Sequence, residues 1–180
     1  ADVPETKKEL VREELHGVEF VDEYRWLEAL EDESEAVRDW TTAQNDHTRR
    51  VLDAIPGRKA LEERFSELLS VGHVSAPVMR QRFYFYTERR GDEDQASLHV
   101  REGVKGEARR LVDPLTLDTE GLYSLDWFVP SHDGQLVAFG ISHAGDEMTV
   151  LHVLETETGE WIADEIAGKT SFGGWAPDGK

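Results

Sequence analysis

The side chains best suited to covalent chemistry in this chain are two serines that lie close to glycines. A nucleophilic serine on a hydrolase sheet needs the pattern Gly-x-Ser-x-Gly at a sharp turn from a strand into a helix. Around Ser142 the sequence reads GISHA, so Ala144 stands where the second glycine is needed, and the context predicts a turn between two strands. Ser171 precedes Gly173, but Lys169 stands where the first glycine is needed. Neither serine is expected to be a nucleophile.

Phosphate-binding and metal-binding patterns are also incomplete. Residues 168–170, Gly-Lys-Thr, match the end of a phosphate-binding loop, but Ala163 occupies the upstream glycine position and no helix is predicted to follow. The acidic runs at 92–94 and 146–147 lack the alternating ligands and distal glutamate of a calcium loop. No histidine pair has the H-E-x-x-H spacing of a zinc site. The histidines are His16, His47, His73, His99, His132, His143 and His152. We therefore predict no catalytic residue, no metal site and no cofactor in this chain.

The amino-acid composition excludes several classes of binding partner and of site. The 180 residues include 20 basic and 38 acidic side chains, a formal net charge of -18, which opposes binding to nucleic acid or to an anionic membrane. The absence of cysteine excludes disulfides, thiolate metal sites and cysteine catalysis. No apolar run approaches the roughly 18 residues of a membrane span, and no signal-peptide segment opens the chain. We expect a cytoplasmic protein, with a periplasmic or secreted mature form as the alternative.

A repeated pattern of short strands organises the second half of the sequence. Residues 127–139, WFVPSHDGQLVAF, read as a strand, a turn at Asp133-Gly134 and a second strand. Upstream, residues 74–86 align with this stretch, so that Pro77 falls on Pro130. The Asp-Gly turn recurs at 178–179. Self-similarity at a period of roughly 40–50 residues, made of short strands, is typical of β-propeller blades.

The strand pattern defines two sets of four strands. The first set comprises 74–78, 82–87, 96–101 and 108–112, and the second comprises 123–129, 136–142, 148–155 and 160–166. We expect one blade at about 73–113, a second at about 123–167 and the start of a third at about 170. Two blades and a fragment leave open sheet edges, which a propeller removes only by closing its ring. The chain is therefore expected to be part of a longer protein and to fold poorly on its own.

The first 72 residues have a different, helical pattern. Residues 1–33 read as an extended arm whose one apolar patch is 24–27, YRWL. A helix is predicted over 32–52, with Asp32 and Glu35 as a capping box and Pro56-Gly57 after its end. Its buried stripe is Val37, Trp40, Gln44, His47, Val51 and Ile55. A second helix, over 59–69, is expected to bury Leu61, Phe65, Leu68 and Leu69.

Specific motifs in this first part resemble the opening of the prolyl oligopeptidases. They are His16-Gly17-Val18, the run DEYRWLE at 22–28, and Trp40 followed by Ala43-Gln44-Asn45. The similarity continues through 56–58, the aromatic run at 82–86, residues 111–114 and the turn at 133–134, so it covers essentially the whole chain. Oligopeptidase B enzymes usually carry another residue where Arg25 stands and lack the Ala-Gln-Asn triplet. The resemblance is therefore to the proline-specific branch of the family.

This resemblance implies a two-module serine peptidase. Residues 1–72 would form an N-terminal arm with two α-helices that packs on a C-terminal α/β-hydrolase domain of the same protein, absent from this chain. Residues 73–180 would form the first two blades and the start of a third in a seven-bladed all-β propeller. The Ser-Asp-His triad would lie beyond residue 180, so the isolated chain is expected to be inactive.

The implied enzyme is a serine endopeptidase that cleaves short peptides on the carboxyl side of proline through an acyl-enzyme. The propeller would control access, with short proline-containing peptides as substrates and neither nucleic acid nor membrane as a partner. In this family an aromatic side chain near the start of the third blade can line the substrate pocket, and Phe172 is the candidate in this sequence.

Two alternatives remain open. A related oligopeptidase with another specificity, such as cleavage at basic residues, would have similar blades because the specificity pocket lies downstream. A non-catalytic propeller that binds peptides or proteins could use the blades alone, although it would not need the helical arm.

Overall fold

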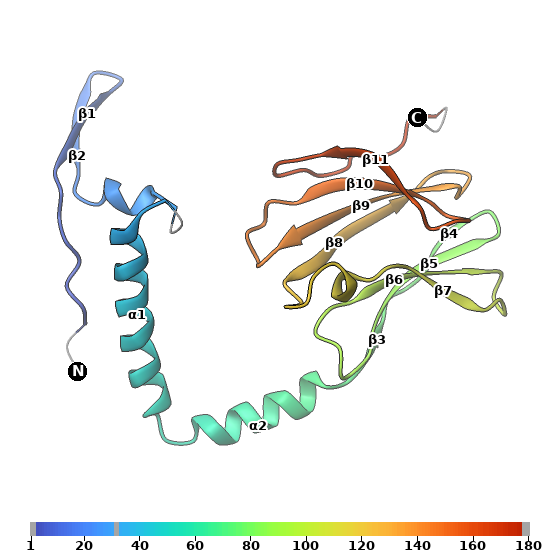
Figure 1. Cartoon of the computed structure of the whole chain (residues 1–180), viewed down its shortest axis with the longest axis horizontal. Coiled ribbons are helices and arrows are strands. Elements are labelled where there is room, and N and C mark those ends of the chain that lie inside the picture. The colour runs from blue at the N-terminus through green and yellow to red at the C-terminus, as the bar shows by residue number, and fades with distance from the viewer. Residues whose placement is uncertain (1–2, 31–32, 178–180) are drawn as a thin grey trace. The chain divides into compact units, whose positions relative to one another are not determined.

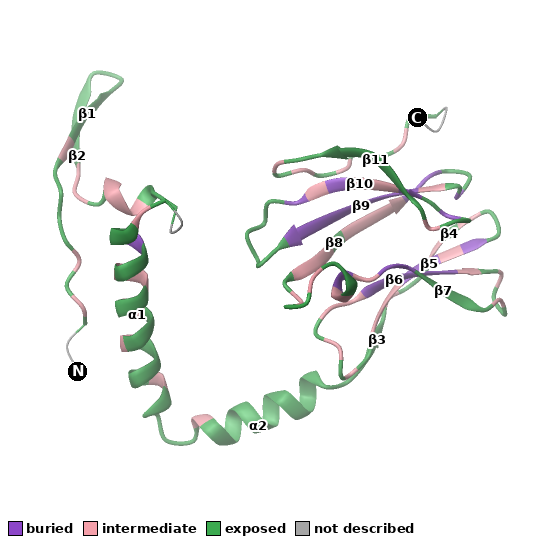
Figure 2. Ribbon diagram, viewed as in Figure 1, coloured by how far each residue is buried: buried purple, intermediate pink, exposed green. Residues whose placement is uncertain are grey.

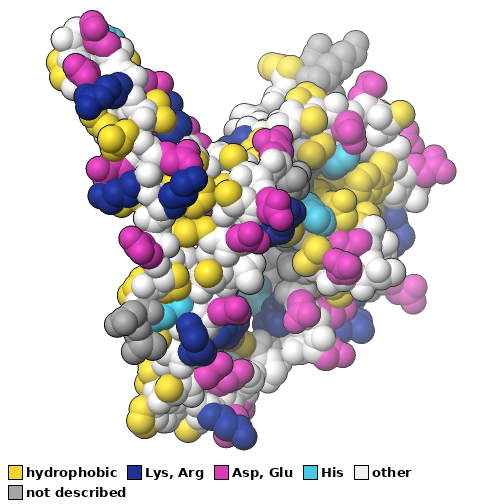
Figure 3. Space-filling view, turned by 60° about the vertical axis from the view of Figure 1, so that its left-hand side comes forward, with side chains coloured by type: hydrophobic (Ala, Val, Ile, Leu, Met, Phe, Trp, Pro, Cys, Tyr) yellow, Lys and Arg dark blue, Asp and Glu magenta, His cyan; other side chains and the backbone are white. Residues whose placement is uncertain are grey.

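The structure, a computed structural model, describes residues 3–30 and 33–177. The chain divides into two compact units, Ala1–Phe65 and Ser66–Lys180. The first unit holds a hairpin and a long helix, and the second is built almost entirely from antiparallel strands (Figure 1). On the face shown in Figure 3, acidic side chains are scattered rather than gathered into one patch. The domain boundary expected at residue 72 stays a prediction.

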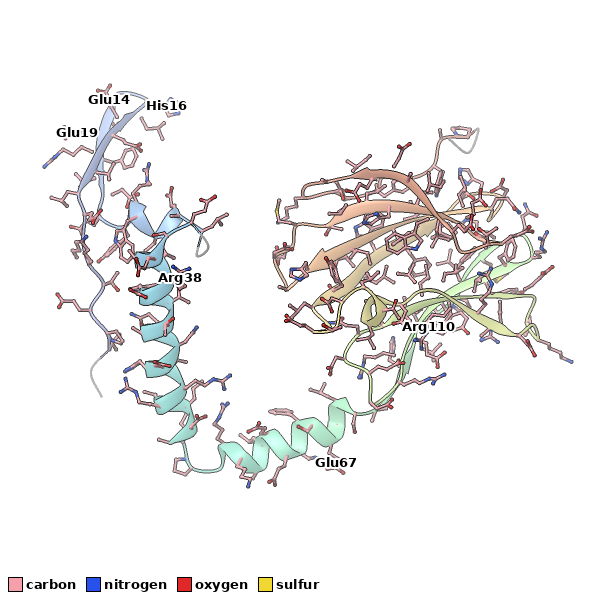
Figure 4. All side chains as sticks on the ribbon, viewed as in Figure 1. Glu14, His16, Glu19, Arg38, Glu67 and Arg110 are labelled. Atoms are coloured by element: carbon pink, nitrogen blue, oxygen red, sulfur yellow. The ribbon has the colours of Figure 1, made fainter. Side chains whose placement is uncertain are left out.

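The first unit begins with a β-hairpin. Strand β1 (Val11–Leu15) pairs antiparallel with β2 (Val18–Asp22). The two residues between them, His16 and Gly17, both have positive φ angles, 52° and 79°, as a tight hairpin turn requires. Glu14, His16 and Glu19 project from the tip of this hairpin (Figure 4). The extended arm expected over residues 1–33 therefore contains a hairpin at 11–22 that was not predicted, because its strands are exposed on both faces and lack a regular apolar alternation.

The first helix, α1 (Glu35–Asp53), follows the short 3-10 helix η1 (Arg25–Glu28). Its N-cap is Ser34, whose hydroxyl accepts a hydrogen bond from the Val37 backbone N–H. The expected cap at Asp32 lies outside the described residues. Of the predicted stripe, Val37 is buried, the next members are half-buried, and Val51 and Ile55 are exposed. The stripe is confirmed only for the first turns of the helix.

Residues near the start of the chain pack on α1. The indole N–H of Trp40 donates to the Thr6 hydroxyl over 3.0 Å, and the Gln44 amide donates to the Pro4 carbonyl. The indole of Trp26 meets that of Trp40 edge to face, with centroids 6.4 Å apart. Trp26 of η1 and Trp40 of α1 therefore belong to one packed cluster with the start of the chain.

The second helix, α2 (Arg58–Leu69), has the predicted extent but not the predicted burial. Its apolar side chains are 51–68% exposed (Figure 2). They are Leu61, Phe65, Leu68 and Leu69. The prediction that they are buried is wrong, because no described element covers that face of the helix.

The first sheet of the second unit pairs its strands in the order β3-β5-β6-β7, with β4 also paired to β5. The strands are β3 (His73–Val74), β4 (Val78–Arg80), β5 (Phe83–Arg89), β6 (Ser97–Glu102) and β7 (Ala108–Val112). The strand expected at 74–78 is interrupted before β4 because Pro77 has no N–H to donate to the ladder. The short 3-10 helix η2 (Pro114–Thr116) follows the last strand.

The second sheet has the order β11-β10-β9-β8. Its strands are β8 (Tyr123–Pro130), β9 (Leu136–His143), β10 (Val150–Glu155) and β11 (Trp161–Ile166). The turn at 131–135 forms as expected: Asp133 accepts hydrogen bonds from the Ser131 hydroxyl and the Gln135 N–H, and Gly134 has a φ of 75°. Among the described residues, neither this sheet nor the first closes on itself.

The two sheets pack through one hydrophobic core. Phe85 and Leu98 of the first sheet and Val137, Phe139 and Leu154 of the second are fully buried in one cluster. Burial of side chains of this size contributes roughly 1.5–3 kcal/mol each. At the edge of the interface the Arg82 guanidinium pairs with Glu157, and Arg109 donates to the Thr156 carbonyl. The two sheets therefore form a single packed body.

Arg89 attaches the segment that follows α2 to the first sheet. Its guanidinium donates to the carbonyls of Leu69 at 2.8 Å, Val71 at 2.9 Å and Glu93 at 3.0 Å. A Cβ on Gly91 would lie 1.9 Å from the Ser70 carbonyl oxygen, so only glycine permits this approach. On the same sheet, Arg110, labelled in Figure 4, pairs with Glu93 and Asp113.

Candidate binding site

Phe172, the candidate pocket residue, lies in the segment that follows β11 and is half-buried. Its ring stacks on the indole of Trp127, with centroids 6.2 Å apart and planes at 15°. The Trp175 indole also meets this ring edge-on, with centroids 5.2 Å apart. Three aromatic side chains therefore form one cluster, to which β8 and the following segment both contribute.

The position of Trp127 depends on a bulge and a glycine. The pairing of β8 with β9 shifts register between Leu125 and Trp127, a bulge that leaves Asp126 without a paired residue. Trp127 then pairs with Gly140, and a Cβ at Gly140 would lie 2.5 Å from the indole. Gly140 thus allows the indole to lie directly on the β9 backbone.

The carboxylate of Asp126, the bulge residue, accepts hydrogen bonds from three hydroxyl groups. These are the hydroxyls of Thr149 at 2.6 Å, of Ser142 at 2.9 Å and of Ser124 at 3.3 Å. Ser142 is the serine of the incomplete nucleophile motif, and its hydroxyl is bound to a carboxylate rather than to a histidine base. This arrangement fixes strand geometry and is not that of a nucleophile activated by a base.

The segment that carries Phe172 is anchored on both sides of that residue. The backbone N–H and the hydroxyl of Thr170 both donate to the Thr149 carbonyl, over 3.0 and 2.7 Å. The Trp175 indole N–H donates to the Val129 carbonyl over 2.9 Å. The segment that carries Phe172 is therefore hydrogen-bonded both to β8 and to Thr149, the residue before β10.

The described histidines do not complete a catalytic or metal site. His99 is buried and stacks on Tyr86, and burial lowers its pKa. His152 stacks on Phe139, and burial also lowers its pKa. Within residues 3–30 and 33–177, no three His, Asp or Glu side chains lie together as metal ligands. No helix in that part of the chain is long and apolar enough to cross a membrane.

Chemically, Phe172, Trp127 and Trp175 offer an aromatic surface, and none of these three side chains is an acid, a base or a nucleophile. This surface is suited to contact a flat or apolar group of a ligand. The family resemblance names Phe172 as a candidate, and its role in a pocket stays a prediction; Trp127, Asp126 and Gly140, whose positions depend on the bulge, were not predicted. The sequence signal that could have found them is the glycine at 140 inside an otherwise apolar strand pattern.

The family model described as "Prolyl oligopeptidase, N-terminal beta-propeller domain" matches residues 4–180. A prolyl endopeptidase from Elizabethkingia meningoseptica is 28% identical over 177 residues, which are 97% of this chain and 24% of that protein. Prolyl oligopeptidase A from Amanita bisporigera is 31% identical over 160 residues, 82% of this chain and 20% of that protein.

A structural match extends over nearly the whole chain. A chain from a study of two prolyl endopeptidases and their inter-domain dynamics superposes with a TM-score of 0.84 at 39% identity, covering 99% of this chain and 26% of that chain. This chain therefore spans about a quarter of the length of the relatives that it matches.

Proposed function

Because this chain belongs to the prolyl oligopeptidase family, we propose that it is the N-terminal portion of a serine endopeptidase that cleaves short peptides on the carboxyl side of proline. The observation that carries the proposal is the match of 99% of the chain, at 39% identity, to a chain solved in a study of prolyl endopeptidases. The reaction would be carried out by a Ser-Asp-His triad in an α/β-hydrolase domain of the same protein, beyond residue 180.

In this proposal residues 1–72 belong to the peptidase module and 73–180 to a seven-bladed propeller. The sheet β3–β7 would be the first blade, β8–β11 the second, and the segment from about 170 the start of the third. The exposed apolar face of α2 supports a docking surface, because Leu61, Phe65 and Leu69 are apolar side chains without cover in the described residues. The proposed occupant of that face is the hydrolase domain.

The proposed role of this chain in the enzyme is to control which peptides reach the active site. A propeller that covers the active site admits only short peptides, and Phe172 would line the substrate pocket from the propeller side. Two observations support this role: the ring contacts both Trp127 and Trp175, and the segment that bears it is anchored at Thr170. A cytoplasmic location, with short proline-containing peptides as substrates, completes the proposal.

The test uses the full-length protein with chromogenic peptides. Benzyloxycarbonyl-Gly-Pro-4-nitroanilide is compared with matched peptides that end in arginine or lysine, and the 180-residue chain is assayed in parallel. We expect cleavage after proline, no cleavage after the basic residues, and no activity from the 180-residue chain.

The two other outcomes identify the alternatives. Cleavage after arginine or lysine but not after proline would place the protein with the oligopeptidases of other specificity. A full-length protein without peptidase activity on any of these peptides would favour a non-catalytic propeller.

A further inference from the structure

A groove of about 390 Å³ lies on the β8–β11 sheet, on the face opposite to Trp127 and Phe172. Ile141 of β9 and Val150 of β10 are paired across the ladder and form an aliphatic floor. Successive strand residues point to opposite faces, so Ile141 lies on the other side of the sheet from Gly140, on which Trp127 rests. The groove is therefore separate from the aromatic cluster around Phe172.

A pair of flat rings flanks the floor on each side. On one side Tyr123 and His143 are cross-strand partners whose ring centroids lie 4.8 Å apart. On the other side the rings of His152 and Trp161 lie 4.9 Å apart. Both pairs line the groove, and each offers π surface beside the aliphatic floor.

The charge of the groove is negative. Glu165, the cross-strand partner of His152, and Asp146, in the loop before β10, line it, whereas no lysine or arginine of the described chain does. His152 Nδ1 lies 3.8 Å from the Glu165 carboxylate, beyond hydrogen-bond distance. Burial lowers the pKa of His152, which disfavours the charged imidazolium that would offset the Glu165 carboxylate. The Glu165 side chain is 62% exposed and open to a ligand.

We propose that this groove binds the guanidinium side chain of a peptide arginine. The aliphatic stem would lie on Ile141 and Val150, the planar guanidinium would stack beside Trp161, and its N–H groups would donate to Glu165. Arginine fits this set better than lysine because its charged group is flat and can bind a carboxylate through two hydrogen bonds. The volume lies in the range of about 300–1,000 Å³ found for small-ligand sites. The proposal does not depend on peptidase activity.

Calorimetric titration of the full-length protein tests the ligand chemistry. The probe is N-acetyl-arginine amide, and its matched control is N-acetyl-citrulline amide, which has nearly the same shape without the charge. We expect the arginine compound to bind about tenfold more tightly, the ratio that a charge-assisted hydrogen bond provides. Equal binding of the two compounds, or no binding of the arginine compound at millimolar concentration, would overturn the proposal.

Two variants locate the binding. Glu165→Gln removes the charge from the groove and is expected to weaken arginine binding about fivefold to tenfold. Asp164→Asn makes the same charge change one residue earlier, at a side chain that does not line the groove, and is expected to leave the affinity unchanged. An unchanged affinity in Glu165→Gln, or equal losses in both variants, would show that the compound binds elsewhere. Cleavage after proline is measured separately, so either proposal can fail without the other.

Discussion

The ring of Phe172 stacks on the indole of Trp127 at a centroid distance of 6.2 Å and an interplanar angle of 15°. The two residues come from different segments, and the stacking holds the aromatic side chain in a fixed position before any ligand arrives. A pre-positioned ring loses little conformational freedom on binding, so the stacking is compatible with the proposed contact between Phe172 and a substrate.

The first prediction concerns Phe172 itself. In the full-length protein, Phe172→Ala is expected to lower kcat/KM for a proline-containing peptide about twofold to tenfold, since an aromatic contact contributes about 0.5–1.5 kcal/mol. The control is Phe172→Tyr, which keeps the ring and is expected to retain most of the activity. If Phe172→Ala lowered the unfolding temperature but left kcat/KM unchanged, the ring would serve packing alone.

The second prediction concerns the glycine beneath Trp127. Gly140→Ala places a Cβ 2.5 Å from the indole and from the Thr149 methyl group, so we expect a loss of about 1–3 kcal/mol in the free energy of unfolding. Gly173→Ala is the matched control, because a Cβ there meets nothing within 4 Å. Denaturant unfolding of the full-length protein measures both, and equal stabilities for the two variants would contradict the proposed close approach.

The third prediction concerns Arg89, whose guanidinium donates to the backbone carbonyls of Leu69, Val71 and Glu93. Arg89→Lys keeps the charge but not the planar group, and should cost about 1–2 kcal/mol of unfolding free energy. The neighbouring Arg90→Lys should cost little, because the Arg90 side chain is exposed and its ion pair with Glu88 is long, at 3.8 Å. Hydrogen exchange at residues 69–72 would show whether the loss of stability is local. Unchanged exchange in Arg89→Lys would contradict the proposal that Arg89 holds this segment on the first sheet.

The fourth prediction is a pH dependence of stability at His99. Burial is the first cause that lowers its pKa below the ordinary 6.5, and its Nε2 has no hydrogen-bond partner in the described residues. The unfolded chain therefore binds the proton more readily than the folded one. Stability is complete above pH 6.5 and falls as the pH drops from the unfolded pKa toward the lower folded pKa.

His99→Phe keeps a ring against Tyr86 and is expected to reduce this loss. Denaturant unfolding between about pH 8 and about pH 5 measures it, a range in which histidine titrates. His132→Gln, at an exposed histidine, is the control and should keep the slope of the original protein. The explanation fails if His99→Phe and the original protein lose the same stability over this range.

Local sequence patterns predicted the two helices, the turn at Asp133-Gly134 and the strands of both sheets, except that the strand expected at 74–78 is divided into β3 and β4. Alternating apolar residues and glycine turns are local signals, and they predicted these elements to within a few residues. The hairpin at 11–22 was not predicted because its ribbon is exposed on both faces, so no strong hydrophobic alternation marks it. His16 and Gly17 were used only as part of the family resemblance, although they form its turn.

Tertiary structure alone decided what surrounds each side chain. The burial expected for Leu61 and Phe65 on α2 was wrong, because the periodicity of a helix shows which face is apolar but not whether anything in the chain covers it. The contact of Phe172 with Trp127 depends on a one-residue bulge at Asp126, and a bulge changes which side chains meet across a sheet. The groove beside Glu165 likewise exists only because strand pairing brings Tyr123, His152 and Trp161 to one face. Local sequence patterns specify elements, whereas register and packing between distant segments specify sites.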